Sequence, residues 1–520
     1  MSKALLANLL ITWLLLPYAA AFLGALLPRL ARWFALLSGL VTLVVGAWCL
    51  MGGSAALDLI GPLGVLLRVD GLAAPFLLLN ALVLLAVLAE RWRRLPEGPF
   101  LVLLPLLLGG LNATAVAVDL VSLYVALEVV GITAFLLILR NRDAGQLWIA
   151  LRYLLVGNSV MTLYLVGVAL LYLQSGSFRF SALAALPPAD PARAVILALV
   201  LVGLFTKGGL FLSGLWLPQT HAEAPADVSA LLSGMAVAGG LCPLLRLAEQ
   251  LPFLQPLLAW LGLASAVLGL VYALMESDLK RLLAWSTLSQ VGLVVIHPPV
   301  GGLVALAHGL AKASLFLLAG HLPSRRLEGW SRRPLPLSLA LPLLLASLSI
   351  AGAPPLLGFR SKEALFSAPL QAASILPGFA SGWLPALLSV GTAAVYARLC
   401  WMPVHRGPSV LASGAIVLTI PLLMAPLLPL PLAGAAMAAA TVAKALAVLA
   451  AGAGVEALRQ LAAELRPGLS PGLCVWRLPD LERLEDLFGC MAVMGLALLL
   501  LLWTRPGPLA VVESGVPWPV

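Results

Sequence analysis

The chain has 520 residues, of which 62% are hydrophobic and only 10% charged, and its mean hydropathy is +1.06. Soluble domains are nearer to one half apolar and one quarter charged. This composition therefore excludes a soluble protein, including a soluble interaction module, and predicts an integral membrane protein.

Long apolar runs predict an all-α polytopic bundle. A membrane-spanning helix needs ~20 largely apolar residues, whereas strands of membrane barrels are short and alternate apolar with polar residues. We expect about fourteen to sixteen transmembrane helices on this criterion. The runs cover residues 4–27, 33–53, 71–90, 98–118, 120–139, 148–173, 194–215, 228–248, 253–274, 283–298, 301–321, 334–352, 375–402, 409–431, 433–453 and 488–504. The first run is too long for a signal peptide, so we expect it to be retained.

The formal net charge of +9 follows the expected topology. Basic residues concentrate in the odd-numbered connections between runs, where Arg91, Arg140, Lys280 and Arg325 are examples. Basic connections stay on the cytoplasmic side of a membrane. The pattern predicts an N-terminus outside the cell and gives no reason to expect a nucleic-acid partner.

No cofactor or metal site is expected in this chain. The five cysteines are scattered without a C-x-x-C pair, whereas iron–sulfur and zinc sites need clustered thiolates. No glycine-rich dinucleotide motif lies between a strand and a helix, and no Walker loop is present. The chain is not expected to be an enzyme by itself, and any redox chemistry would belong to partner subunits.

Several charged or titratable residues lie within the apolar runs. They are Glu128, Lys207, His308, Lys312, Arg398 and Lys444. A charge at the bilayer centre costs at least ~2.5 kcal/mol, so such residues often mark ion pathways. Glu128 and Lys207 lie near the middle of their runs, which favours a function. Arg398 and Lys444 lie nearer to run ends, where a side chain that reaches the interface is an alternative.

Glycine and proline residues interrupt two of the runs. Lys207 is followed by Gly208 and Gly209, and then by His221 and Glu223. Such breaks are tolerated where protein or a water-filled cavity satisfies the freed backbone groups. They are typical of discontinuous helices in ion-coupled transporters. A similar pattern precedes Lys362, and there a simple loop remains an equal alternative.

The order of motifs resembles one known family. The segments are LYVALEVVGITAFLL with Glu128, LFTKGGLFLSGLWLPQTHAEAPADVSALLSG with Lys207, ESDLKRLLAWSTLSQVG, AHGLAKASLFLLAG with His308 and Lys312, and GAPPLLGFRSKEALF with Lys362. Together they resemble the antiporter-like subunits of Mrp-type cation/proton antiporters and of proton-pumping NADH–quinone oxidoreductase (complex I and its photosynthetic relative). The resemblance runs in order from about residue 60 to 400.

The resemblance implies two inverted five-helix repeats, each with a broken helix. We expect N-terminal helices over 1–97, a translocating core over 98–405, and C-terminal helices over 406–520 with an amphipathic segment near 454–487. The implied ion-translocation residues are Glu128, Lys207, His308, Lys312 and Arg398, supported by His221, Glu223 and Lys362.

One position departs from the family pattern. The family usually has a second lysine in LLSGxxxKTG, whereas this chain reads LLSGMAVAGG with Ala238. Either the lysine relay is interrupted, or another group such as His308 replaces it. This departure and the divergent RLPDLERLEDLFG segment favour an Mrp-type subunit that moves protons, with coupling to sodium left open.

Other settings stay open for the same chain. The main alternative is a pump subunit of an NADH- or ferredoxin–quinone (plastoquinone) oxidoreductase. A subunit with an inorganic-carbon-uptake or hydrogenase partner, and a degenerate scaffold, are further alternatives. The expected partners are other membrane subunits and the lipid bilayer, in a bacterial-type cell membrane or a thylakoid-type membrane.

Overall fold

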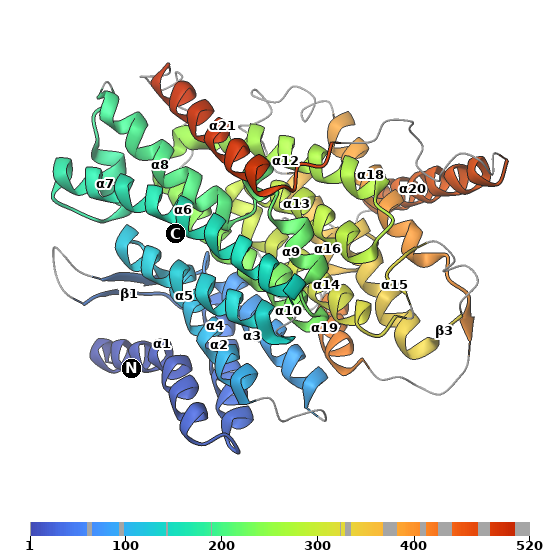
Figure 1. Cartoon of the computed structure of the whole chain (residues 1–520), viewed down its shortest axis with the longest axis horizontal. Helices are drawn as coiled ribbons and strands as arrows, with labels where there is room; N and C mark the ends of the chain where they lie inside the picture. The colour runs from blue at the N-terminus through green and yellow to red at the C-terminus, as the bar shows by residue number, and fades with distance from the viewer. Residues whose placement is uncertain are drawn as a thin grey trace.

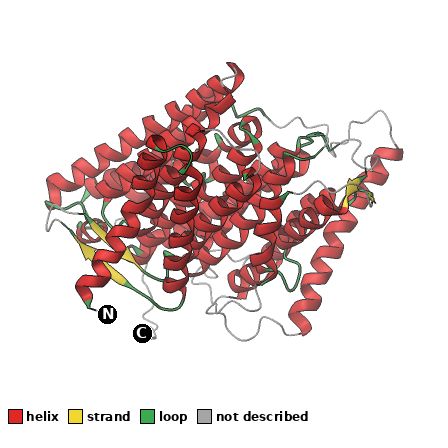
Figure 2. Cartoon of the chain, turned by 90° about the horizontal axis from the view of Figure 1, so that it is seen from below, coloured by secondary structure: helices red, strands yellow, loops and turns green. Residues whose placement is uncertain are grey.

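The computed structural model is a bundle of helices (Figure 1) with two small pairs of strands at its margins (Figure 2). It describes residues 2–504 except 60–64, 93–97, 142–143, 189, 323, 328–333, 368–381, 406–411, 425–438 and 466–478. Within this part, 13 helices are long and apolar enough to cross a membrane, or up to 14 when one bent pair counts as a single span. The predicted all-α polytopic fold is confirmed.

The first half of the chain contains most of the long helices. Its elements are α1 (Lys3–Leu26), α2 (Ala31–Leu50), β1 (Ala55–Asp58), β2 (Leu66–Val69), α3 (Ala74–Arg91), α4 (Gly98–Val116), α5 (Leu120–Ile138), α6 (Ala144–Ser175), α7 (Phe180–Ala185), α8 (Pro191–Lys207), α9 (Leu217–Glu223), α10 (Ala226–Leu231) and α11 (Val237–Gln250). Three short helical turns complete this half, namely η2 (Leu139–Asn141), η3 (Phe211–Gly214) and the π-helical η4 (Leu232–Ala236).

The second half adds the central helices and two peripheral ones. Its elements are η5 (Pro252–Leu254), α12 (Gln255–Met275), α13 (Leu279–Ile296), α14 (Pro298–Ala319), β3 (Leu335–Pro336), α15 (Leu337–Ala351), α16 (Leu357–Ser367), α18 (Trp383–Cys400), β4 (Val404–His405), α19 (Ser413–Leu423), α20 (Ala439–Leu465) and α21 (Leu484–Trp503). Parts of the predicted spans 375–402, 409–431 and 433–453 lie outside the described residues. Of the predicted amphipathic segment, residues 454–465 continue α20, residues 484–487 begin α21, and 466–478 lie outside the described part.

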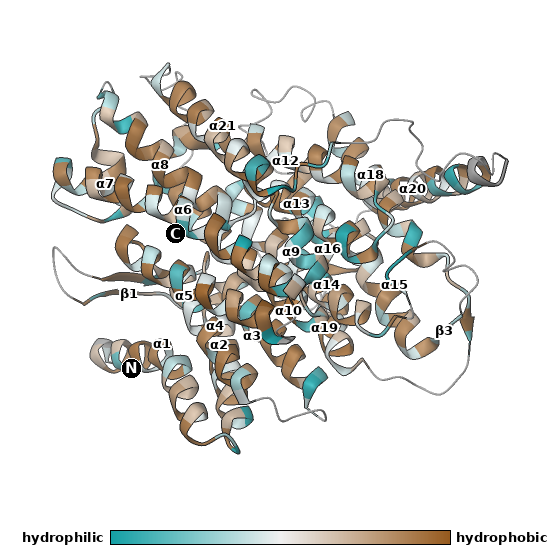
Figure 3. Ribbon diagram, in the orientation of Figure 1, coloured by the Kyte–Doolittle hydropathy of each residue, from teal (hydrophilic) through white to brown (hydrophobic). Residues whose placement is uncertain are grey.

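The core of the bundle is formed by α10–α11, α13 and α14. Their most apolar windows are 100%, 94% and 94% buried, against 11% for α20 and 22% for α21. Hydrophobic residues cover most helices, and hydrophilic colour appears on α9 and α16 (Figure 3). Helix α13 packs directly on α12, since a Cβ added at Gly292 would lie 2.2 Å from the carbonyl oxygen of Gly262. Small residues allow such backbone contact between membrane helices.

Ion pairs link the connections at the two ends of the bundle. Asp70, which precedes α3, accepts two hydrogen bonds of 2.9 Å from the buried Arg246 of α11. At the end of α3, the Nη2 of Arg91 lies 2.8 Å from Asp227, whose carboxylate also lies 2.6 Å from Arg140. The two groups therefore lie at opposite ends, and Arg91 and Arg140 share one end as the alternating topology predicts.

The strands are additions that the hydropathy pattern did not predict. Strands β1 and β2 form an antiparallel hairpin that pairs Ala55 with Val69. Strands β3 and β4 form a parallel pair of two residues each. Both pairs lie in connections between helices, so they do not change the helical character of the membrane-spanning part.

Candidate functional site

Glu128 and Lys207 meet inside the bundle. Glu128 lies in the middle of α5 and Lys207 is the last residue of α8, and their Oε1 and Nζ atoms are 3.5 Å apart. Their side chains are 19% and 10% exposed. The Lys207 ammonium also lies 3.5 Å from the carbonyl oxygen of Leu127. The structure thus brings together the two residues that the sequence singled out most strongly.

Two glycines make room for the Lys207 ammonium. A Cβ added at Gly131 of α5 would lie 2.9 Å from Nζ, and one at Gly157 of α6 would lie 3.5 Å from it. A larger side chain at Gly131 would displace the ammonium, because 2.9 Å is closer than a carbon and a nitrogen approach without repulsion. Both glycines were missed in the sequence, since only the packing of α5, α6 and α8 reveals their proximity to Lys207.

The helix that carries Lys207 is broken directly after it. Gly209 has a φ of +66°, in the left-handed region that favours glycine. The two parts, Pro191–Lys207 and Phe211–Glu223, are bent by 43°. The indole of Trp216 donates a 2.8 Å hydrogen bond to the carbonyl oxygen of Thr206, which satisfies one carbonyl freed by the break. The predicted discontinuous helix at this position is confirmed.

Lys312 and His308 lie one turn apart on the central helix α14. Lys312 is fully buried and donates a 2.5 Å hydrogen bond to the carbonyl oxygen of Leu283, and its Nζ lies 5.4 Å from the centre of the Tyr396 ring. His308 is 7% exposed, and neither of its ring nitrogens has a hydrogen-bond partner among the described residues. An unpartnered buried imidazole can accept or donate a proton when water or another group reaches it.

A small cavity joins His308 to Lys362. It has a volume of about 10 Å³ and is lined by Gln290, His308, Ser349 and Lys362, among other residues. This is close to the smallest volume that holds one water molecule. The Lys362 ammonium donates a 3.2 Å hydrogen bond to the carbonyl oxygen of Ala351. The cavity can therefore hold a water molecule between the imidazole and the ammonium.

The break before Lys362 lies inside the bundle. Helix α15 is followed at once by Gly352, which has a φ of +94°. A Cβ added at Gly358 would lie 1.7 Å from the carbonyl oxygen of Ser349, so the next helix starts in contact with the previous one. Ala353 and Leu356 within the break are 7% and 3% exposed. This favours the discontinuous helix over the simple loop that the sequence left open.

Two other predicted residues have separate positions. Arg398 donates 3.2 Å hydrogen bonds to the carbonyl oxygens of Ala273 and Leu274, at the end of α12. A cation at this place stabilises a helix C-terminus. Glu223 is 48% exposed and lies 3.7 Å from Arg325 at the end of the bundle. These contacts place Arg398 at a helix end and Glu223 in an exposed ion pair. A role of either residue in ion translocation stays a prediction.

His221 is fully buried on α9. Its ring lies 5.9 Å from the ring of Trp216 and 5.8 Å from that of Phe316, which is four residues from Lys312. Neither ring nitrogen has a hydrogen-bond partner in the described part of the chain. His221 therefore lies on the second part of the broken helix and faces α14. Its supporting role stays a prediction.

Ala238 leaves a gap between the two lysine sites. It is 6% exposed and lies on α11, directly after the π-helical turn Leu232–Ala236. In that turn, the hydroxyl of Ser233 lies 2.9 Å from the hydroxyl of Thr287 on α13. This hydroxyl pair gives the region between Lys207 and Lys312 a polar contact, but it adds no charge to replace the family lysine.

Lys280 lies inside helix α13 and not in the connection that the apolar runs predict. That prediction is wrong for this residue. It is the second residue of α13, is 5% exposed, and donates a hydrogen bond to the carbonyl oxygen of Ala224. The neighbouring Arg281 instead faces outward. The sequence holds no signal for this difference, since the residues three and seven positions after Lys280 and those after Arg281 are all buried.

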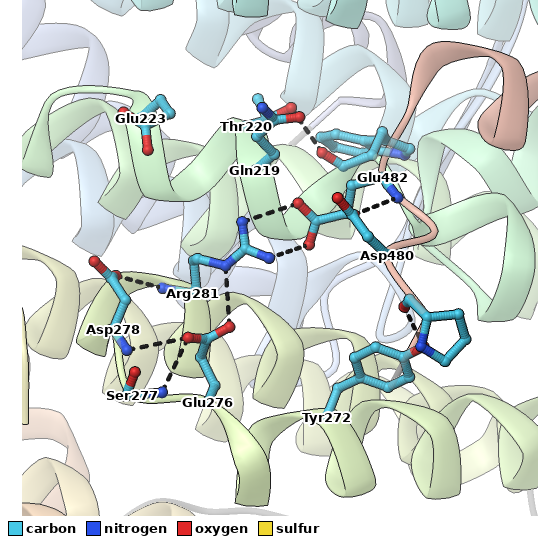
Figure 4. A network of polar contacts seen from close by, with 12 residues as sticks. Gln219, Thr220, Glu223, Tyr272, Glu276, Ser277, Asp278, Arg281, Asp480 and Glu482 are labelled. Atoms are coloured by element: carbon cyan, nitrogen blue, oxygen red, sulfur yellow. Dashed lines mark hydrogen bonds and ion pairs between the residues drawn. The ribbon is translucent and has the colours of Figure 1, made fainter. Parts of the chain in front are cut away.

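Arg281 anchors the chain before α21 to the core. It contacts Glu276 at 3.0 Å and pairs with both oxygens of Glu482, at 3.0 and 2.8 Å (Figure 4). The hydroxyl of Tyr272 donates a 3.0 Å hydrogen bond to the carbonyl oxygen of Pro479 in the same segment. Burial raises the pKa of the Glu482 carboxyl. These contacts link residues about two hundred positions apart or more, so they could not be inferred from the sequence.

The fold and the site define a polytopic membrane protein with charged side chains at two breaks in its helices. Such breaks occur where transporters hold ions near the membrane midplane. Residues 117–384 match the family model described as "NADH:quinone oxidoreductase/Mrp antiporter, TM". The chain belongs to this family, as its motifs predict.

Relatives come from both branches of the family. The chain is 32% identical to NADH-quinone oxidoreductase subunit N of Desulforudis audaxviator, over 70% of this chain and 81% of that protein. It is 31% identical to a probable K(+)/H(+) antiporter protein of Rhizobium meliloti, over 71% of this chain and 41% of that protein. It is 30% identical to a Na(+)/H(+) antiporter protein of Alkalihalophilus pseudofirmus, over 50% of this chain and 57% of that protein.

Solved structures show the same fold in large membrane complexes. A chain of the Mrp complex from Dietzia has a TM-score of 0.67 and 27% identity, with 95% of this chain and 56% of that chain covered. A chain of respiratory complex I from Thermus thermophilus has a TM-score of 0.63 and 26% identity, with 89% and 100% covered. The similar proteins in these structures are subunits of multisubunit membrane assemblies.

Proposed function

We propose that this chain is an ion-translocating subunit of a multisubunit cation/proton antiporter of the Mrp type. The contact of Glu128 with Lys207, at the break that follows α8, carries this proposal. A buried carboxylate stabilises the protonated lysine while the two are paired, and the lysine can release its proton when they separate. Relatives named as K(+)/H(+) and Na(+)/H(+) antiporter proteins support it. We assign protons as the translocated ions, and the experiment below tests their coupling to sodium.

The geometry suggests how charge moves. When Lys207 is paired with Glu128, its ammonium is held at the end of α8 between Gly131 and Gly157. When the pair opens, the ammonium loses its main counter-charge and can give its proton to a neighbouring acceptor. In the second half, a water molecule in the cavity can connect the His308 imidazole with the Lys362 ammonium, next to Lys312.

A second setting is a proton-pumping subunit of an NADH- or ferredoxin–quinone oxidoreductase. The similarity to subunit N of Desulforudis audaxviator favours it. In both settings the chain works with other membrane subunits in a bacterial-type or thylakoid-type membrane, with its N-terminus outside. We assign it no cofactor and no metal, and any electron transfer belongs to partner subunits.

Everted vesicles that carry the whole operon test the proposal. Sodium-triggered proton movement is compared between the wild type and Glu128→Ala, without an electron donor. A sodium response that disappears in the variant supports the antiporter. Pumping that needs NADH or ferredoxin and depends on Glu128 moves the chain to the oxidoreductase setting. Equal activity in both proteins under both conditions would leave only a scaffold role.

A further inference from the structure

Lys280 is a buried lysine outside the chain of residues considered above. It is 5% exposed, and its ammonium donates a hydrogen bond to the carbonyl oxygen of Ala224. Ala224 is the C-cap of α9, the second part of the broken helix. Lys280 therefore connects the first turn of α13 to the end of the helix that carries His221.

Charged groups surround Lys280 on its outer side. Glu223 and Asp227 flank its acceptor Ala224 in the chain, and Asp278 is the N-cap of its own helix. Arg325 is adjacent, since its carbonyl oxygen accepts a 2.7 Å hydrogen bond from the N–H of Leu279. Arg325 links two of these carboxylates, at 3.7 Å from Glu223 and 3.1 Å from Asp278. Figure 4 shows Glu223 and Asp278 on the same side of Arg281. Glu223 is 48% exposed, so this outer group is in contact with solvent.

On its inner side Lys280 is near His221. The Ser229 hydroxyl lies 3.2 Å from the carbonyl oxygen of Ala224, which accepts from Lys280, and 2.7 Å from that of His221. On its other side the His221 ring lies 5.8 Å from the ring of Phe316, which is one helical turn after Lys312. His221 is fully buried, and neither ring nitrogen is hydrogen-bonded within the described ranges. The His221 imidazole thus has a ring nitrogen that can accept a proton. It lies on the element that Lys280 caps, and it faces α14, the helix that carries Lys312.

We propose that Lys280 carries protons between solvent at this end of the bundle and the buried His221 and Lys312. This inference rests on the proposed function. The Lys280 ammonium gives one proton to a water molecule that is hydrogen-bonded to a neutral His221 nitrogen, and this water passes one of its protons to the imidazole. Lys280 becomes an amine and His221 an imidazolium. Lys280 then regains a proton from water beside the Glu223 carboxylate. The hydrogen bond to Ala224 is kept throughout, because the amine retains two N–H groups.

The missing lysine at position 238 is the reason to expect a separate route. The lysine that the family pattern has after the LLSG segment is replaced by Ala238 in this chain. A route through Lys280 and His221 reaches Lys312 without passing that position. The second half of the protein can then exchange protons with solvent independently of the Glu128–Lys207 pair.

A helix-capping role is the competing explanation for Lys280, and arginine separates the two. An arginine keeps the positive charge and the donor to Ala224 but does not release its proton, whereas a lysine can. We therefore compare Lys280→Arg with wild type in the assembled complex, using sodium-triggered proton movement in everted vesicles. Lys444→Arg, the same substitution at an exposed lysine of α20, is the matched control.

The expected result is at least a tenfold loss of transport in Lys280→Arg, with unchanged assembly and a wild-type rate in the control. Wild-type transport in Lys280→Arg would show that the residue is only a cap and would overturn the inference. Glu128→Gln is measured in the same vesicles. If it is inactive while Lys280→Arg is active, the proposed function stands and only the inference fails.

Lys280→His gives a second readout that does not depend on arginine fitting the site. Free histidine titrates near pH 6.5 and lysine near 10.4. If position 280 transfers protons, the histidine variant should transport with a pH profile displaced to the acid side. A profile that coincides with that of the wild type would contradict the inference, also in the case that Lys280→Arg fails to assemble.

Discussion

The ion pair between Glu128 and Lys207 predicts a specific pattern of non-additive mutations. We consider Glu128→Gln and Lys207→Gln, which remove each charge while keeping a polar side chain of similar size. At the observed 3.5 Å separation, two unit charges attract by about 5 kcal/mol at an effective dielectric constant near 20. The side chains are 19% and 10% exposed, so solvent screening reduces this to about 3 kcal/mol.

An energy of about 3 kcal/mol corresponds to roughly two decades in rate, since about 1.4 kcal/mol is one decade. Each single variant should therefore lower the rate of proton movement about a hundredfold. If the two residues work as one unit, the double variant should be no slower than either single one. Rates would be measured from the quenching of a pH-sensitive dye in everted vesicles, normalised to the amount of assembled complex.

The opposite pattern would refute the reasoning. If the double variant loses the product of the two single effects, the residues act independently and their contact is not the working unit. Glu128→Asp serves as a control, because it keeps the charge but withdraws it by one methylene group. We expect it to retain more transport than Glu128→Gln.

Three further predictions concern the framework of the site. Gly240→Ala would place a Cβ 2.2 Å from the backbone nitrogen of Gly208 at the helix break, so it should destabilise the protein by about 1–3 kcal/mol. The measurement is the melting temperature in detergent. The control Gly454→Ala, where a Cβ meets nothing within 4 Å, should leave that temperature unchanged. Arg246→Met removes the two hydrogen bonds to Asp70 and leaves the exposed Arg68 as the ion-pair partner of Asp70. The substitution should cost about 1–3 kcal/mol, partly recovered by adding Asp70→Asn, in the same melting assay. Burial raises the pKa of the Glu482 carboxyl in the folded protein. Its contribution to the free energy of unfolding is therefore full below the carboxyl pKa of the unfolded chain and is lost as pH rises through the pKa of the folded protein. Glu482→Gln should remove this decrease, measured as the free energy of unfolding against pH.

The fold and the central pair could be predicted because each has a local signature. A membrane-spanning helix is encoded by about twenty consecutive apolar residues, so the sequence alone predicts it. A charged residue within such a run is identified in the same way. Glu128 and Lys207 were identified in this way, and the glycines after Lys207 marked the break. The paired positions were not deduced from spacing, since the two residues are far apart in the chain and the bundle alone brings them to 3.5 Å.

The remaining parts of the site depend on packing between distant segments. Lys280 resembled a topology charge because it follows an acidic residue at the start of a helix, and only the contact with Ala224 shows that it faces inward. The resemblance predicts Arg398 on the ion path, and only the structure shows that its guanidinium donates to the last carbonyls of α12. In both cases the sequence shows a basic residue, but the direction of its side chain depends on a contact with a distant segment of the chain.

The two halves of the site hold their charges differently, and this difference bears on the missing lysine. Lys207 has a carboxylate partner, whereas Lys312 and Lys362 donate to backbone carbonyls. A carboxylate pair can be opened by a small movement of α5 or of the break in α8, but a carbonyl contact changes only when a helix end moves. The first half is therefore suited to respond to charge, and the second half to pass protons through water and imidazole. With Ala238 between them, the halves need not share one continuous relay, because electrostatic coupling across the bundle acts without a proton crossing the gap.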